Sequence, residues 1–144
     1  MNRERAIQTT LLLLRLVVGA MFMQHGAAKL FGWFGGMPGG MKAPIMSEIG
    51  LAGILEFAGG IAILLGLATR VVGFVLSGEM AVAYFQVHAH MGMWPIENKG
   101  EVAVLYCFIF LYLAARGAGE YSLDAVFARR QPAHTAPTGL PGTA

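Results

Sequence analysis

A chain of 144 residues has the length of a single domain, but this one is too apolar for a water-soluble protein of that size. Hydrophobic residues make up 56% and charged residues 12%, about half the charged share of a soluble domain, so one small core could not hide the apolar surface. The net charge of +2 is small and spread along the chain, which argues against nucleic-acid binding and leaves the lipid bilayer as the expected environment.

The elements predicted in chain order are four membrane-spanning helices. Crossing the hydrocarbon takes roughly 17–25 predominantly apolar residues. Four stretches meet this requirement, at about 7–28, 49–68, 71–90 and 101–117. The sequence therefore predicts an all-α integral membrane protein, an antiparallel up-and-down four-helix bundle that forms one domain over residues 1–128.

The connecting segments fit this order. The stretch FGWFGGMPGGMKAPIMSE contains too many glycines and prolines for a helix, and the second and third spans are joined almost directly at Thr69 and Arg70. After Gly119 we predict one short interfacial helix, capped by Ser122. A disordered tail rich in Pro, Thr, Ala and Gly is expected over residues 129–144.

The charges flanking the spans predict an orientation. Four spans place both termini on the same side of the membrane. That side carries Arg3, Arg5, Arg70, Arg116, Arg129 and Arg130, whereas the other side carries Lys29, Lys42 and Lys99. Because cytoplasmic loops carry the excess of basic residues, both termini are expected in the cytoplasm.

Three of the spans each contain one charged residue that would be costly in the membrane: Arg15, Glu56 and Glu79. A charge at the bilayer centre costs roughly 2.5–3.5 kcal/mol on insertion scales. At about 1.5 Å per residue, all three lie roughly 12–18 Å from the predicted cytoplasmic ends of their helices. We expect Arg15 to pair with the two carboxylates, one of which carries a proton because one arginine cannot balance both. This layer either holds the helices together or forms a catalytic, proton-handling site.

A second set of polar residues falls in the outer third of the predicted spans: Gln24, His25, Lys29, Gln86, His88, His90 and Glu101. Histidines from two helices would suit a haem or metal ion. However, His88 and His90 are two residues apart and point to different sides of a helix, and the chain has no HExxH motif and a single cysteine. We therefore predict no metal. A ligand-binding lining for a head group is favoured over a metal or haem site, and plain interfacial polarity stays open as the alternative.

Small and aromatic residues on the spans are interpreted as packing features. Gly53, Gly59, Gly60 and Gly66 would let neighbouring helices approach closely, as interfaces within membranes require. Aromatic residues such as Tyr106 recur along the spans, and such side chains usually serve to fill the space between helices.

Four motifs carry a resemblance to a known family. In chain order they are LRLVVGAMFMQHGAAKLFGWFGG, EFAGGIAILLGLATR, AYFQVHAHMGMWP and GEVAVLYCFIFLYLAARGAGEYSLD. Over about residues 11–127 the chain resembles the DoxX family of small bacterial four-helix membrane proteins. The positions that match the family motifs are Arg15, His25, Lys29, Glu56, Arg70, His88 and Glu101, whereas Glu79 is selected on depth alone. The resemblance implies a place in the inner (plasma) membrane and a link to quinone handling and oxidative stress.

Three functions remain open on this basis. The leading hypothesis is a redox-associated subunit that binds a quinone-like lipid within the bundle, where Arg15, Glu56 and Glu79 handle protons. Nothing in the chain supplies an electron carrier, so a redox partner protein would bring it, and whether the chain is itself an enzyme stays open. The alternatives are a non-catalytic anchor that recruits a soluble oxidoreductase, and a small transporter. A homo-oligomer is compatible with each of them.

Overall fold

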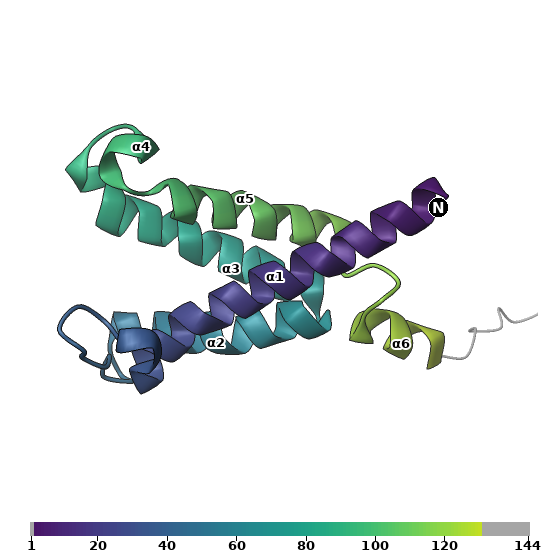
Figure 1. The fold of residues 1–144 in the computed structure, drawn as a ribbon, viewed down its shortest axis with the longest axis horizontal. Coiled ribbons are helices and arrows are strands. Elements are labelled where there is room, and N and C mark those ends of the chain that lie inside the picture. Colours follow the sequence, from purple (N-terminus) through teal and green to yellow (C-terminus); the bar gives the residue numbers. More distant parts are fainter. Residues whose placement is uncertain (1, 131–144) are drawn as a thin grey trace, which may run out of the picture.

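The computed structural model describes residues 2–130, and this part of the chain is helical, with no β-strand (Figure 1). The elements in order are α1 (Arg3–Phe31), η1 (Trp33–Gly35), α2 (Glu48–Leu65), α3 (Thr69–Ala83), η2 (Tyr84–His88), η3 (Ala89–Met91), α4 (Pro95–Asn98), α5 (Glu101–Arg116) and α6 (Leu123–Arg130). We call the end that carries residue 3 and α6 the terminal end. The opposite end, with residues 32–47 and 92–100, is the loop end.

Three helices are long and apolar enough to cross a membrane: α1, α2, and the helical run Thr69–Met91 that begins with α3. The predicted all-α class is therefore confirmed. The helix α5 has 16 residues, just below the usual spanning length, so its role as a fourth span stays a prediction. The ends of the first helix differ from the expected 7–28, because Asn2 accepts a hydrogen bond from the Arg5 amide and starts α1 earlier.

The long helices form two pairs, α1 with α2 and α3 with α5, and α2 leads into α3 through a short turn (Figure 1). Glycines fix the register of the first pair. Gly19 lies against the backbone of Gly60, and Gly26 lies against the backbone of Gly53, so that a Cβ atom on either α1 glycine would overlap α2. Glycines seven residues apart on both helices thus allow close antiparallel contact, and the predicted role of Gly53 and Gly60 is confirmed.

An apolar layer lies between the two pairs and consists of Phe22, Ile63, Leu76, Phe110 and Leu113. Each of these side chains is at most 1% exposed. The Phe22 ring meets the Phe110 ring edge-on, with centroids 4.7 Å apart, which joins α1 to α5. This layer is the centre of the hydrophobic core.

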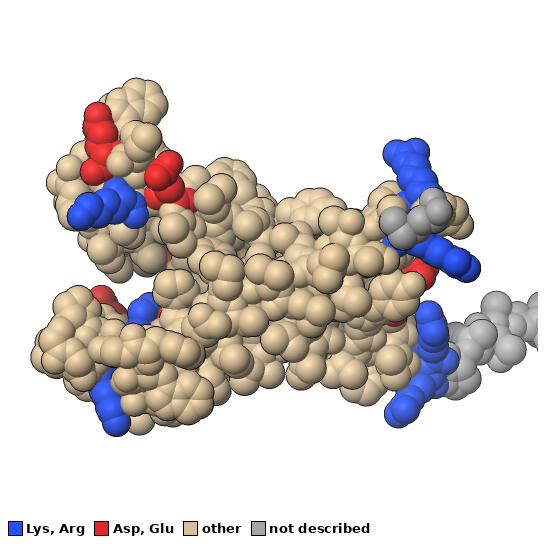
Figure 2. Space-filling model, viewed as in Figure 1, with Lys and Arg blue, Asp and Glu red and all other residues tan. Residues whose placement is uncertain are grey.

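The outer surface is apolar between two charged ends. Large apolar side chains such as Val17, Phe74 and Phe108 are exposed on α1, α3 and α5. Figure 2 shows that the middle of the visible face lacks charge, whereas acidic and basic side chains gather toward both ends. A surface of this kind is suited to lipid tails flanked by two layers of head groups.

The chain after α5 folds back across the terminal end. The Ser122 hydroxyl accepts a hydrogen bond from the Ala125 amide at 3.2 Å, which confirms the predicted cap of a short helix. The Asp124 carboxylate accepts hydrogen bonds from the amides of Ala68 (2.6 Å) and Thr69 (2.9 Å) and so caps α3. The helix α6 runs to Arg130, so the predicted start of the tail, residue 129, still belongs to this helix. The rest of the expected tail, residues 131–144, lies outside the described part of the chain.

Candidate functional site

An ion pair joins α1 to α2 near the loop end. The Lys29 ammonium lies 2.5 Å from Oε1 of Glu56. The carboxylate is only 4% exposed, whereas the lysine side chain is 27% exposed. Gly53 lies one turn from Glu56 and lets the stem of Lys29 pass close to α2, with 3.1 Å between the lysine Cβ and a Cβ built on the glycine. The lysine therefore reaches inward from the end of α1 to a buried acid.

A second carboxyl group faces the same interior from α3. Both oxygens of Glu79 are buried, and neither has a hydrogen-bond partner among residues 2–130. Gly59 on α2 lies against the Leu76 side chain on α3. Because the two helices run antiparallel, this contact places Glu79 at the level of Glu56. A buried carboxyl group in this position requires either a proton or a hydrogen-bond donor.

The long helix α5 contributes Tyr106 to the same interior. Its ring packs against Phe22 (centroids 5.1 Å apart) and Phe110 (5.7 Å), and the centroid of the His25 ring, which is perpendicular to it, is 6.1 Å away. The hydroxyl group is buried and is without a partner in the described part of the chain. Tyr106 therefore places a buried hydroxyl group in the same interior, next to aromatic rings.

We call His25, Lys29, Glu56, Glu79 and Tyr106 the central polar cluster. Its members come from α1, α2, α3 and α5, and it lies next to the apolar layer on the loop side. Four of its oxygen atoms, including Oε2 of Glu56, are buried and have no protein partner within residues 2–130. Because buried polar groups are normally hydrogen-bonded, this arrangement can accept and donate hydrogen bonds to a ligand beside an aromatic surface.

Arg15 does not join this cluster, so its expected pairing with Glu56 and Glu79 is wrong. It is fully buried, and its Nη2 donates a 2.5 Å hydrogen bond to the carbonyl oxygen of Tyr121. The register set by Gly19 and Gly60 places Arg15 at the last turn of α2, roughly 12 Å along α1 from the level of Glu56.

The surroundings of Arg15 belong to the terminal end. The guanidinium packs against Gly66, the left-handed residue that ends α2, and against Ser122. Its Nε and Nη1 atoms have no hydrogen-bond partner among residues 2–130. The Arg15 guanidinium therefore contacts the segment that follows α5 rather than the carboxylates of the spans.

The expected outer set is divided by the structure. Lys29 and His25 belong to the central polar cluster, so a separate outer layer that contains Lys29 is wrong. The remaining side chains are exposed or directed elsewhere: Gln24, Gln86, His90 and Glu101 are exposed. His88 stacks on Tyr84, and its Nδ1 lies 3.0 Å from the carbonyl oxygen of Asn98.

Asn98 holds the loop between η3 and α5. This buried side chain donates hydrogen bonds to the Tyr84 hydroxyl (3.1 Å) and the Gly92 carbonyl (2.9 Å), and it accepts one from the Gly100 amide (2.8 Å). Its Tyr84 partner begins η2, a π-helical turn, and such turns are frequent at functional sites. Within the described residues no three His, Cys, Asp or Glu side chains gather as a metal site would require.

Sequence reasoning missed Tyr106 as a member of the cluster, since it was interpreted as packing, and it missed the structural roles of Asp124 and Asn98. A signal for the register was nevertheless present. Two glycines seven residues apart occur on α1 and again on α2. Matching these pairs in antiparallel order would have placed Arg15 eight residues, roughly 12 Å, from the level of Glu56.

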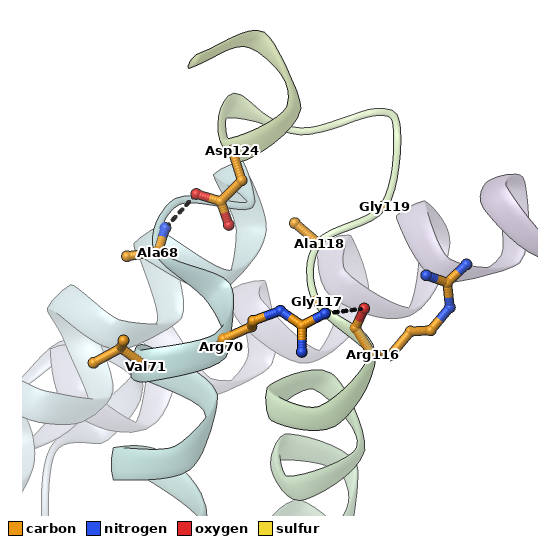
Figure 3. Close-up of a pocket in the computed structure, with 8 residues that line it drawn as sticks. All are labelled: Ala68, Arg70, Val71, Arg116, Gly117, Ala118, Gly119 and Asp124. Atoms are coloured by element: carbon orange, nitrogen blue, oxygen red, sulfur yellow. Dashed lines mark hydrogen bonds between the residues drawn. The ribbon is translucent and has the colours of Figure 1, made fainter. Parts of the chain in front are cut away.

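A surface hollow of about 390 Å³ lies at the terminal end, between α3, the end of α5 and α6 (Figure 3). Its lining residues are Ala68, Arg70, Val71, Arg116, Gly117, Ala118, Gly119 and Asp124. Nη1 of Arg70 donates to the Ala115 carbonyl at 2.6 Å, and the Arg116 side chain points away from the hollow (Figure 3). Its charged groups therefore tie helix ends together, and the central polar cluster remains the better candidate for chemistry.

Comparison with known proteins adds three relatives and one family. The family model for DoxX matches residues 10–89. An uncharacterized protein of Haemophilus influenzae is 42% identical over 90% of this chain and 98% of its own length. The Bacillus subtilis protein named "Putative oxidoreductase CatD" is 31% identical over 86% of this chain and 90% of its own length. The Escherichia coli inner membrane protein YqjF is 27% identical, over 83% and 92%. No solved structure matches the chain.

Proposed function

From the premise that this chain belongs to the DoxX family and is a multi-pass protein of the inner membrane, we propose that it is a redox-associated subunit. In this proposal the central polar cluster binds the head group of a quinone-like lipid and exchanges protons with it. We further propose that α5 is the fourth span of an antiparallel bundle and that both termini are cytoplasmic.

The observation that carries this proposal is the convergence of unpaired buried oxygens beside an aromatic stack. Glu79 and Tyr106 come from different helices, and neither side chain has a protein partner within residues 2–130. A quinone head is a flat ring with oxygen atoms on opposite edges. Its ring suits the aromatic surface that Phe22 and Tyr106 provide, and its oxygens suit the polar atoms around it.

The cluster also contains groups that can donate and accept the protons that reduction of a quinone requires. Reduction of a quinone to a quinol takes two electrons and two protons. The Tyr106 hydroxyl or the Lys29 ammonium can donate to a quinone carbonyl, and the Glu79 carboxylate can accept from a quinol hydroxyl. The electrons would come from a partner protein with a flavin, an iron–sulfur centre or copper. The Bacillus subtilis relative is named as an oxidoreductase, which supports an association with redox chemistry.

Binding of a short-chain quinone to the purified protein in nanodiscs tests the proposal. Glu79→Leu and Tyr106→Phe should each weaken binding about tenfold, because each removes a buried hydrogen bond worth on the order of 1.4 kcal/mol. The matched controls are Glu97→Leu and Tyr112→Phe, which alter exposed side chains and should leave binding unchanged.

Unchanged binding in both cluster variants, or no binding by the native protein, would overturn the proposal. Recruitment of a soluble oxidoreductase without quinone binding would instead support an anchor. Solute flux through liposomes that contain this protein alone would support a transporter. Extraction and identification of lipids that copurify with the native protein gives an independent measurement.

A further inference from the structure

We propose that the central polar cluster is accessible only from the loop end of the protein, so that both ligand and protons reach it from that face. The inference rests on the site of the proposed function, but it holds for any ligand of that site. Three features of the described residues support it: a seal on one side of the cluster, ties that cross the terminal end, and the lack of such ties at the loop end.

The apolar layer seals the cluster from the terminal end. Ile63 follows Glu56 by seven residues on α2, and Leu113 follows Tyr106 by seven residues on α5, so about 10 Å of apolar packing separates the cluster from that end. The side chains of this layer are at most 1% exposed. Such close packing leaves no path for a hydrated proton or a head group.

One hydroxyl lies near this layer, on Ser77 of α3. Its Oγ is 3.5 Å from the sulfur of Cys107 on α5, so this polar atom is already paired across the α3–α5 contact. Leu76 on α3 and Phe110 on α5 lie nearer the terminal end than these two groups, and both belong to the apolar layer. The Ser77 and Cys107 side chains therefore do not continue as a chain of polar groups toward that end. The seal is therefore continuous across both helix pairs.

Hydrogen bonds that link separate elements close the terminal end. Arg15 on α1 binds the Tyr121 carbonyl, and the Glu120 amide donates to the Gln8 side chain on α1 at 3.0 Å. Asp124 binds the first turn of α3. The segment 117–124 thus connects α5 to α1 and α3, which holds the two pairs together at this end.

The loop end has no equivalent ties among residues 2–130. The side-chain hydrogen bonds there remain within one pair: Lys29 binds Glu56 between α1 and α2, and Asn98 binds Tyr84 on the α3–α5 side. No residue of η2 or η3 is buried. Figure 1 shows the pairs diverging toward this end, and Figure 2 shows the surface hollowed between them.

An amphipathic ligand would therefore enter between the two pairs from the leaflet at the loop end, with its head toward Lys29 and His25. Both residues reach the surface on this side of the apolar layer, since Lys29 is 27% exposed and His25 is exposed. Protons taken up or released by the cluster would exchange with the aqueous phase at the same face. A site open to one face is distinct from the alternating access that a transporter requires.

Cysteine labelling with a small membrane-impermeant thiosulfonate tests this access. In a Cys107→Ala background, His25→Cys and Glu79→Cys report the cluster. Met93→Cys in the loop before α4 reports the loop end, and Phe127→Cys on α6 reports the terminal end, because both side chains are exposed. Each variant is reconstituted, and reagent is applied from one side at a time.

We expect reagent on the side that labels Met93→Cys to label both cluster variants at least tenfold faster than reagent on the side that labels Phe127→Cys. His25→Cys changes an exposed side chain, so it remains informative if Glu79→Cys fails to fold. Faster labelling from the terminal end, or labelling of neither cluster variant from the loop end, would overturn one-sided access. Failure of a short-chain quinone to slow one-sided labelling would count against the proposed function and leave the access inference standing.

Discussion

At the scale of single residues, the central feature is a lysine that neutralises a buried acid. Taking Glu56 out of water is costly, and the attraction of Lys29 offsets that cost only while both partners are present. The remaining oxygen of Glu56 has no protein partner in the described part of the chain. The pair is therefore expected to matter more for stability when one member is removed than when both are.

Lys29→Met should lower the free energy of unfolding in detergent by on the order of 3–5 kcal/mol, because it leaves an uncompensated buried charge. Adding Glu56→Gln to this variant should recover most of the loss. Denaturant titration followed by helical circular dichroism measures both effects, and Lys42→Met, which alters an exposed lysine, serves as the control. Equal losses in the single and the double variant would contradict the interpretation of the pair.

Hydropathy identified the buried charges from the sequence but not their partners. Glu56, Glu79 and Arg15 were recognised because each interrupts an apolar run. Their partners depend on how far one helix is shifted along its neighbour. The mean hydropathy of a helix is the same at every such shift, so hydropathy does not indicate which residues lie at the same level. The partner of Arg15 is moreover a backbone carbonyl more than a hundred residues away, which no side-chain pattern indicates.

At the scale of the helices, glycine contacts set the geometry of the first pair. Gly26 lies against the backbone of α2, whereas a Cβ atom added at Gly78 on α3 would meet nothing within 4 Å. The two positions offer a matched comparison of the same substitution in a tight and in an open place on a helix.

Gly26→Val should separate α1 from α2 and lower the free energy of unfolding by roughly 1–3 kcal/mol, as overpacking does. Because Lys29 is one turn away on α1, this variant should also weaken its ion pair with Glu56. Gly78→Val should leave stability nearly unchanged. Melting temperatures in one detergent provide the measurement, and similar losses at both positions would show that close approach is not the cause.

A second prediction for an element concerns the start of α3. Asp124 supplies the cap for this helix from a segment far along the chain, through the amides of Ala68 and Thr69. Asp124→Ala should cost about 0.5–2 kcal/mol of stability, and Asp124→Asn should cost less because the amide oxygen can still accept. Hydrogen exchange at the first turn of α3 would locate the effect. Unchanged exchange in Asp124→Ala would contradict the assignment of the cap.

At the scale of the whole molecule, the bounds of the helices were predicted within a few residues, since length and hydropathy determine them locally. The division into two pairs that diverge at the loop end was not predicted, because it depends on which faces meet. The structure also sharpens the charge comparison between the two ends. Lys29 is engaged inside the protein by Glu56, which leaves Lys42 and Lys99 as the exposed cations of the loop end.

Six exposed arginines at or near the terminal end therefore outnumber the two exposed lysines at the loop end, and the termini should be cytoplasmic. A green fluorescent protein fused after residue 144 should fluoresce in cells. Alkaline phosphatase inserted after Gly39, at the loop end, should be active because it folds outside the cytoplasm. The opposite pattern of the two reporters would reverse the proposed orientation and place the open face of the central polar cluster toward the cytoplasm.

The contact between Arg15 and Tyr121 has a consequence for biosynthesis. Arg15 enters the membrane as part of the first helix, but the carbonyl that it binds is translated more than a hundred residues later. Until then the nascent chain carries an arginine without its final partner, so the first helix can reach its mature position only after residue 121 has been made. A chain whose synthesis stopped before that residue would keep a buried guanidinium without this hydrogen bond.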